Sequence, residues 1–345
     1  MRLAGYLALA ALLVGLAWAK KKKPDEETQA LLLPKDPPAA VMGETSRLVF
    51  RTTPLLNKGL LSAQTREAVR GLLRQNSGLE TIKIRAFVAG SGDLRRIPSI
   101  VSELFTEKKQ PLPAVTVVLA GGLPLENAQV VLESVSLAKH QVNAGGLVFV
   151  PAQTVELDRP LQPLQPLAQE AIARLKTALG ANTDILRVTC FATSLDTAAA
   201  LTGLMNSAFP NAALDLVQTQ REPLKSSFGC EAVARLTREG PGGSAVTAPR
   251  LVFTGTQLAF GFQDADAVLA LQRLDRLLSP FGSSLKRAVL INFFPLSSSV
   301  SEEIARVAPP FFDPAHLPGV TRVPFEGLQG IDSSFAAEAV AVVNQ

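Results

Sequence analysis

The chain has 345 residues, with 34 lysines and arginines against 30 aspartates and glutamates, so its formal net charge is +4. Apolar residues make up 47% of it and charged residues 19%, a balance that excludes disorder throughout. Only two histidines and two cysteines occur, and they form no His-Glu-x-x-His or paired Cys-x-x-Cys motif. The glycine-rich motifs that bind nucleotide phosphates are missing too. We therefore expect no metal and no cofactor.

The start of the chain predicts a signal peptide. Arg2 is followed by an apolar stretch from Leu3 to Ala17, and Ala17-Trp18-Ala19 provides the small residues that flank a cleavage point. A membrane anchor is the alternative, but about 20 apolar residues are needed to cross a bilayer and this stretch is shorter. We expect residues 1–19 to be removed and the protein to be secreted or periplasmic.

The next segment, residues 20–45, predicts a solvated tether, because lysines and prolines alternate there with acidic residues. Four consecutive lysines at its start can make weak contact with an anionic lipid or wall polymer, at about 1 kcal/mol for each lysine. They are Lys20, Lys21, Lys22 and Lys23. The alternative, which the composition favours, is a linker without a partner.

The rest of the chain carries one pattern three times. The word Leu-Val-Phe begins each copy, at residues 48–50, 147–149 and 251–253. A helical stretch ending at a glycine follows, then an apolar strand centred on a phenylalanine, a second helix closing on a phenylalanine, and an apolar strand containing a glutamate. These markers are Gly78, Gly180 and Gly282; Phe87, Phe191 and Phe293; Phe105, Phe209 and Phe312; and Glu133, Glu231 and Glu338. We infer three domains, at residues 46–140, 141–240 and 241–345.

The sequence pattern within each domain predicts one sheet with helices on one face. In the second domain Ala168, Ile172 and Leu175 recur at helical spacing. In the first, the strand 82–88 alternates apolar residues with Lys83 and Arg85, which indicates helices on one side only. The other face needs cover, and the economical solution packs the three sheets around a pseudo-threefold axis. The predicted fold class is α+β, with three tandem domains that form an intramolecular pseudo-trimer.

These residues resemble the Rid (YjgF/RidA) family. Gly145-Gly-Leu-Val-Phe-Val-Pro-Ala-Gln153 is similar to the family's Gly-Gly-Leu-Val-Phe-Val-Ser-Gly-Gln strand, and Glu231-Ala-Val-Ala234 follows in the family's order. Gly255-Thr-Gln257 and Glu338-Ala-Val-Ala341 repeat the match, whereas the first domain diverges, with Pro54 at the glutamine position. The resemblance implies bacillus chorismate mutase-like domains, normally a homotrimer with ligand clefts between subunits. It also implies hydrolysis of enamines or imines to 2-ketoacids and ammonia.

The resemblance assigns candidate site residues. The family's substrate-binding arginine falls on Val115, on residue 213 or 214, and on His316, so no cleft has the guanidinium that grips a carboxylate. The three marker glutamates lie two residues from the position that places the attacking water, on the same strand face. They are the catalytic candidates Glu133, Glu231 and Glu338. The ligand-binding candidates are Gln153, Gln257, Val115, His316 and Arg322.

Each candidate has a structural alternative. The glutamates would tie neighbouring domains together through backbone amides, and the glutamines would cap strand ends. His316 and Arg322 would lie at the surface. Cys190 and Cys230 fall on predicted neighbouring strands, where export permits a disulfide and burial as apolar thiols is the alternative.

A substrate carboxylate without a guanidinium would be desolvated and unpaired, which is costly. We therefore expect an exported Rid-like protein, monomeric, that binds a small molecule in degenerate clefts between its domains or acts as a scaffold. The alternative is an enamine/imine deaminase, a hydrolase, that uses Glu338 and His316. We expect no nucleic-acid partner, because the only tryptophan and tyrosine, Trp18 and Tyr6, lie in the signal peptide and leave no aromatic groove.

Overall fold

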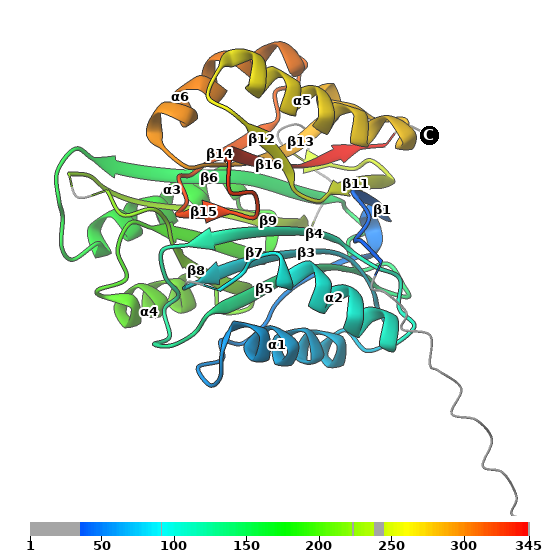
Figure 1. Ribbon diagram of the computed structural model, residues 1–345, viewed down its shortest axis with the longest axis horizontal. Helices are drawn as coiled ribbons and strands as arrows, with labels where there is room; N and C mark the ends of the chain where they lie inside the picture. The colour runs from blue at the N-terminus through cyan, green and yellow to red at the C-terminus, as the bar shows by residue number, and fades with distance from the viewer. Residues whose placement is uncertain (1–34, 91, 223, 238–244, 344–345) are drawn as a thin grey trace, which may run out of the picture. The chain divides into compact units, whose positions relative to one another are not determined.

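The computed structural model describes residues 35–90, 92–222, 224–237 and 245–343, and Figure 1 shows their arrangement. The predicted signal peptide and the four lysines of the tether lie outside these residues. The described chain contains three β-sheets, each accompanied by two α-helices, which is the α+β class expected from the sequence. Within it, no helix is both long and apolar enough to cross a membrane. Short 3-10 turns lie at Thr45–Arg47, Ser279–Phe281, Leu285–Arg287 and Pro309–Phe311.

The first sheet has the strand order β15-β4-β3-β5-β2. β3 and β4 run parallel, so a helix, α2, connects them, while the other pairs are antiparallel. Its own elements are β2 (Leu48–Thr52), α1 (Leu61–Gln75), β3 (Glu80–Ala89), α2 (Arg96–Glu107), β4 (Ala114–Ala120) and β5 (Val130–Leu137).

The second sheet has the order β10-β6-β9-β7-β8, with β7 and β8 parallel. Its own strands, β6-β9-β7-β8, repeat the order β2-β5-β3-β4 of the first sheet. Its own elements are β6 (Leu147–Leu157), α3 (Gln165–Leu179), β7 (Thr183–Ala192), α4 (Ala198–Ala208), β8 (Ala213–Gln218) and β9 (Ser226–Leu236).

The third sheet has the order β1-β11-β16-β13-β14, with β12 also paired to β16 and with β13 and β14 parallel. Its own elements are β11 (Arg250–Thr254), β12 (Gln257–Phe260), α5 (Asp264–Leu278), β13 (Ala288–Pro295), α6 (Ser298–Val307), β14 (Gly319–Arg322) and β16 (Ser333–Val342). The three-fold repetition of one strand order agrees with the repeat predicted from the sequence.

Short strands from elsewhere in the chain complete the sheet edges. β1 (Ala40–Glu44) pairs with β11 of the third sheet, β10 (Ala245–Val246) with β6 of the second, and β15 (Gly327–Leu328) with β4 of the first. The prediction of a tether up to residue 45 is thus wrong at its end. Residues 40–44 are largely apolar, and the open edge of β11 offers them unpaired backbone groups.

The marker glycines follow the first helix of each sheet, as predicted. Gly78, Gly180 and Gly282 have φ angles of 78°, 73° and 68°. A side chain is strained in this left-handed region, so glycine suits the turn by which the chain leaves a helix.

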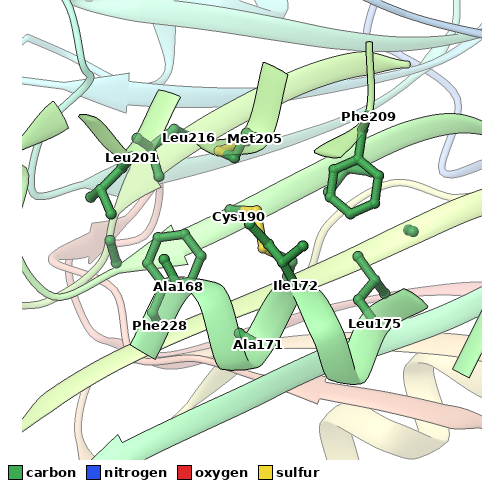
Figure 2. Packing of buried hydrophobic residues seen from close by; sticks show 14 of the residues in the cluster. Ala168, Ala171, Ile172, Leu175, Cys190, Leu201, Met205, Phe209, Leu216 and Phe228 are labelled. Atoms are coloured by element: carbon green, nitrogen blue, oxygen red, sulfur yellow. A yellow bond between two sulfur atoms is a disulfide. The ribbon is translucent and has the colours of Figure 1, made fainter. Parts of the chain in front are cut away.

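Each pair of helices covers one face of its sheet with an apolar core. Figure 2 shows the core of the second sheet, where α3 and α4 pack over the strands. Ala168, Ile172 and Leu175, which the helical spacing selected, are all buried there. Cys190 and Cys230 lie directly opposite each other on β7 and β9 and form a disulfide under these helices.

The faces without helices pack against one another. Register makes Phe87, Phe191 and Phe294 equivalent, because each stands opposite the residue two places before its domain's glutamate. The third marker is therefore Phe294 and not Phe293. All three surround Phe325, with ring centroids 5.8, 6.0 and 5.4 Å from it, respectively. The three sheets thus share one buried interior.

Candidate functional site: a charge cluster between the three sheets

The three marker glutamates lie together in this shared interior. Glu133 on β5, Glu231 on β9 and Glu338 on β16 are 0%, 1% and 9% exposed. Their side chains point away from the helices of their own sheets. The residues that stand opposite them on the neighbouring strands are, in the same order, Arg85, Thr189 and Asn292.

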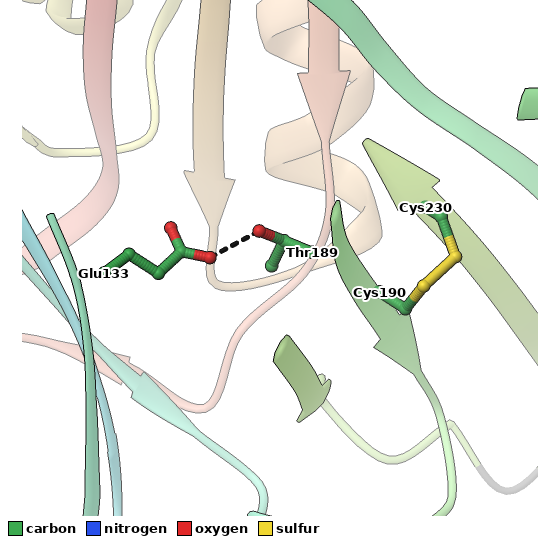
Figure 3. Close-up of a disulfide and its surroundings, with 4 residues drawn as sticks. All are labelled: Glu133, Thr189, Cys190 and Cys230. Carbon is green, nitrogen blue, oxygen red and sulfur yellow. Dashed lines mark hydrogen bonds between the residues drawn. A yellow bond between two sulfur atoms is a disulfide. The ribbon is translucent and has the colours of Figure 1, made fainter. Parts of the chain in front are cut away.

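One guanidinium joins the three carboxylates. Arg85 Nη2 lies 2.5 Å from Glu231 Oε1 and 2.6 Å from Glu133 Oε2, and Arg85 Nη1 donates to Glu338 Oε1 at 3.3 Å. Thr189 of the second sheet donates to Glu133 of the first, as Figure 3 shows. The glutamates therefore connect the three sheets, as the structural alternative predicts, but through a guanidinium and not through backbone amides.

Two further cations complete the group. Lys83 Nζ lies 2.6 Å from Glu338 Oε2 and also donates to the side chain of Thr116 and the carbonyl of Thr254. Arg187 Nη1 lies 3.4 Å from Glu133 Oε2. Three cations thus face three glutamates. We call these six residues, together with Asp215, the central cluster.

Asp215 on β8 adds a fourth carboxyl. It is 6% exposed, and within the described residues its Oδ2 has no hydrogen-bond partner. Burial raises the pKa of Asp215 well above its ordinary 3.8, and the charge of Glu133 raises it further. A protonated Asp215 can act as a donor to Glu133. Beside this carboxyl, the other six side chains of the central cluster are three basic and three acidic ones, so the two kinds match in number.

Two of the glutamates, Glu133 and Glu338, are held ionised by neighbouring cations. Burial alone would raise the pKa of Glu338, but Lys83 and Arg85 outweigh it and lower that pKa to about 2. Burial would likewise raise the pKa of Glu133, which Arg187 and Arg85 lower instead. A general base works best with a pKa near the operating pH. A carboxylate with so low a pKa is a weak proton acceptor.

Strand register shows that the cluster is built from equivalent positions that have diverged. Lys83, Arg187 and Leu290 each stand opposite the valine two places after the glutamate of their domain. The first domain therefore supplies two of the cations, the second domain one, and the third none. The equivalents of Asp215, each opposite the residue that faces a glutamate, are Thr116 and Thr321. Charge balance exists only when all three sheets are together.

A cavity of about 30 Å³ adjoins the cluster. The phenylalanines of the three Leu-Val-Phe words, Phe50, Phe149 and Phe253, line it together with the cationic side chains. The guanidinium of Arg187 lies 5.7 Å from the ring centroid of Phe50. Such a volume holds roughly one water molecule. This cavity is therefore too small for a metabolite.

The two glutamines predicted to bind ligand make local bonds. Gln153 donates its amide to the carbonyl of Pro151 at 3.0 Å, and Gln257 donates to the carbonyl of Leu258 at 3.0 Å. Both are half-buried. Gln257 begins β12, where the strand-capping alternative places it, whereas Gln153 lies within β6 opposite Cys230 and caps no strand end.

The arginine-equivalent positions need one correction. Ile84 lies opposite Val115, Val188 opposite Leu214, and Ile291 opposite Val320. The third equivalent is therefore Val320 and not His316, which lies four residues earlier, because β14 begins only after a loop rich in proline. All three positions are aliphatic, and each packs into or against the core of its own sheet.

His316 and Arg322 are both exposed. His316 Nδ1 lies 3.3 Å from Asp313 Oδ2, three residues away. Arg322, at the end of β14, borders a mostly apolar hollow of about 260 Å³ beside α6. Neither residue meets the glutamates, so the structure does not bring the predicted site together.

Backbone contacts join the domains near these positions. Thr256 donates its amide to the carbonyl of Val115 at 3.1 Å, which links the third domain to the first. Ala152 donates its amide to the hydroxyl of Thr321 at 2.9 Å, which links the second to the third.

The cations of the central cluster are not among the site residues predicted from the sequence. Lys83 and Arg85 were visible as the residues that alternate with the apolar side of their strand. Arg187 occupies the corresponding place in Leu186-Arg-Val-Thr-Cys190. The signal in the sequence was a charged residue on the strand face that has no helices. Because that face must also be buried, a charge there predicts a buried ion pair. Among the described residues, no group of histidine, cysteine, aspartate and glutamate is arranged to hold a metal.

No protein-family model matches the chain, and no curated protein matches it. Solved structures that resemble part of the chain include two members of the YjgF family and yeast Mmf1. A Neisseria meningitidis member is 18% identical over 28% of this chain and 81% of its own, with a TM-score of 0.26. A Mycobacterium tuberculosis member of the YjgF/YER057c/UK114 family is 23% identical over 27% and 79%, with a TM-score of 0.25. Yeast Mmf1 is 19% identical over 30% and 91%, with a TM-score of 0.26.

Proposed function

We propose that this chain is an exported, single-chain Rid-like protein that binds a small molecule or serves as a scaffold and does not perform enamine or imine deamination. Its three sheets would make the intramolecular equivalent of a trimer, with degenerate clefts between the domains. The observation that carries the proposal is the central cluster: the three candidate catalytic glutamates pair with buried cations, beside a cavity of only about 30 Å³.

The arginine-equivalent positions support the same conclusion. Val115, Leu214 and Val320 are aliphatic, so a substrate carboxylate at any of the three junctions would lack its bidentate partner. Such a charge loses its hydration on entering a cleft and gains no ion pair in return. Binding of a neutral or aromatic small molecule does not meet this obstacle.

Export is supported by two features. The predicted signal peptide precedes the folded domains, and the Cys190–Cys230 disulfide fits an oxidising compartment. A monomer is expected because the units that a homotrimer brings together by association are here parts of one chain. Light scattering of residues 20–345 should return the mass of one chain, and the mass of three chains would contradict the monomer.

The activity test uses freshly generated 2-aminoacrylate. The purified mature chain should release ammonia no faster than the spontaneous reaction, while an active Rid deaminase assayed in parallel should accelerate it. Turnover above background that is lost in Glu338→Gln and kept in Glu103→Gln, an exposed carboxylate on α2, would overturn the proposal and establish the deaminase alternative.

A further inference from the structure

Helix α6 of the third domain carries a carboxylate at a position that packs against the core. Its buried residues follow the spacing i, i+3, i+4, i+7, which places them on one face of the helix. The same spacing recurs among the core residues of the second helix in each of the other domains. The three sets are Ile97, Ile100, Val101 and Leu104 on α2; Leu201, Leu204, Met205 and Ala208 on α4; and Val300, Glu303, Ile304 and Val307 on α6. Glu303 therefore stands where the other domains have isoleucine and leucine.

The carboxyl group of Glu303 is buried without a donor. The residue is 7% exposed, and within the described part of the chain its side chain makes no hydrogen bond and no ion pair. Removing an ionised carboxylate from water is costly unless donors or a cation replace the water. A position of this kind favours the neutral, protonated form of the carboxyl group.

The charged groups around Glu303 strengthen this preference. Asp264 and Asp266, in the first turn of α5, both repel a negative charge on Glu303. Arg306, three residues further along α6, attracts such a charge, but its Nε already donates to Asp264 Oδ2 at 3.2 Å. Burial therefore raises the pKa of Glu303 above its ordinary 4.5, and the two aspartates raise it further against the attraction of Arg306.

The other elements around α6 bring no compensating charge to Glu303. β13 and the 3-10 turn Pro309–Phe311 both pack against α6, and neither contains a charged residue. On β14, the guanidinium of Arg322 donates to the backbone carbonyl of Ser301 and not to Glu303. The aspartates of α5 and Arg306 are therefore the groups that decide the charge of Glu303.

We propose that Glu303 makes the packing of α6 on the third sheet sensitive to pH. A protonated carboxyl is neutral and can donate a hydrogen bond to a neighbouring carboxylate, so it fits its core-facing position. An ionised carboxylate is repelled by both aspartates and gains by reaching water, which weakens the packing of the helix. Since α6 also forms one wall of the hollow of about 260 Å³ beside β14, this weakening opens the hollow. The switch goes beyond the proposed function, because it needs neither a substrate nor the central cluster.

The test is hydrogen exchange of residues 20–345, measured by mass spectrometry from pH 4 to pH 7 and corrected for the intrinsic exchange rate. A raised pKa in the folded state gives protection that is present below the ordinary pKa and is lost as the pH rises. The protection of the α6 amides should therefore fall by up to about tenfold per pH unit above about pH 4.5, until Glu303 is ionised. The fall should exceed any change in α3 of the second domain. Glu303→Gln is neutral at every pH and should keep α6 protected, and Glu303→Leu, which introduces the residue found at position 204, should do the same.

The matched control is Glu302→Gln, which neutralises the exposed carboxylate next to Glu303 on the same helix and should leave the fall unchanged. The proposal is overturned if the protection of α6 does not depend on pH, if it falls equally in α3, or if it falls in Glu303→Gln as in the unmodified protein. Loss of the fall in Glu302→Gln would contradict it as well. None of these results would alter the outcome of the 2-aminoacrylate assay, so the two proposals fail separately.

Discussion

The helix-covered cores and the shared interior of the three sheets are built on different principles. Each core is apolar and belongs to one sheet, and nearly all of its residues come from one domain. The shared interior combines aromatic rings with the central cluster, whose charges come from all three sheets. The comparison teaches that the three copies kept their individual cores and diverged where they meet.

This divergence has a consequence for assembly. In a symmetric homotrimer every subunit would contribute the same cation, whereas here a single residue, Arg85, contacts all three glutamates. Its equivalents, Thr189 and Asn292, are neutral. The three domains are therefore no longer interchangeable, and fusion into one chain is what allows the charges to be divided unequally among them.

Removing Arg85 should produce the largest loss of stability. The three buried carboxylates would then have only two cationic partners, Lys83 and Arg187. Arg85→Met is expected to lower the free energy of unfolding by at least about 3–5 kcal/mol, the cost of breaking a buried ion pair on one side. Urea unfolding followed by circular dichroism measures this. If the variant does not fold, Arg85→Lys can be measured instead. It keeps the positive charge but loses the guanidinium that contacts several carboxylates at once, so its stability should lie between those of Arg85→Met and the unmodified protein.

The control for this variant is Arg66→Met, which breaks the partly exposed pair between α1 and α2. Arg66 and Glu103 lie 2.7 Å apart, but such a pair contributes less than about 1 kcal/mol. Equal losses for Arg66→Met and Arg85→Met would show that the central cluster is no more important than a surface contact.

The disulfide lies in the helix-covered core of the second sheet, and its removal tests how much that core contributes to stability. Cys190 and Cys230 are 40 residues apart in sequence, so replacing both with alanine should cost about 4 kcal/mol through loop closure in the unfolded state. Unfolding of the unmodified protein with and without reductant should show the same loss. Titration of the unfolded, unreduced chain should find no free thiol, and two free thiols would contradict the disulfide.

Asp215 should give the smallest effect and one that depends on pH. Because burial raises its pKa in the folded state, the folded protein binds a proton that the unfolded chain releases above about pH 4. Stability from this group is thus present below pH 4 and is lost as the pH rises, by about 1.4 kcal/mol per pH unit while Asp215 stays protonated. Asp215→Asn, whose side chain does not titrate, should not show this loss of stability with rising pH.

The measurement compares unfolding free energies of Asp215→Asn and the unmodified protein from pH 4 to pH 6. The variant should gain relative stability as the pH rises. Glu338 has the opposite sign, since its lowered pKa means that its stabilising contribution disappears as the pH falls from about 4.5 towards 2. A difference between the two proteins that does not change with pH would indicate that Asp215 is ionised in the folded state.

The fold was largely accessible to sequence reasoning because its signals are local. Helical spacing in residues 168–175, strand alternation in 82–88 and the marker glycines each depend on a few neighbouring residues. The edge strands were not accessible. Residues 40–44 are too short to distinguish from the end of a linker, and only the open edge of β11 makes them a strand.

The site was accessible in part. The recurrence of Glu133, Glu231 and Glu338 singled out residues that do meet in space. Their role was not visible, because a carboxylate in an apolar strand is equally suited to catalysis or to an ion pair until its partner is known. The position of His316 was misjudged, because alignment by a Pro-Ala pair cannot detect that β14 starts later than β4 does relative to that pair.

By itself the sequence determined the number of repeats, the α+β class and the faces of the strands, since these follow from residue order and periodicity. The tertiary structure decided which charges meet. Arg85 and Glu338 are 253 residues apart along the chain, and nothing local favours their contact. Their pairing, and with it the conversion of candidate catalytic groups into a buried cluster, exists only because three sheets face one another in a medium where an unpaired charge is costly.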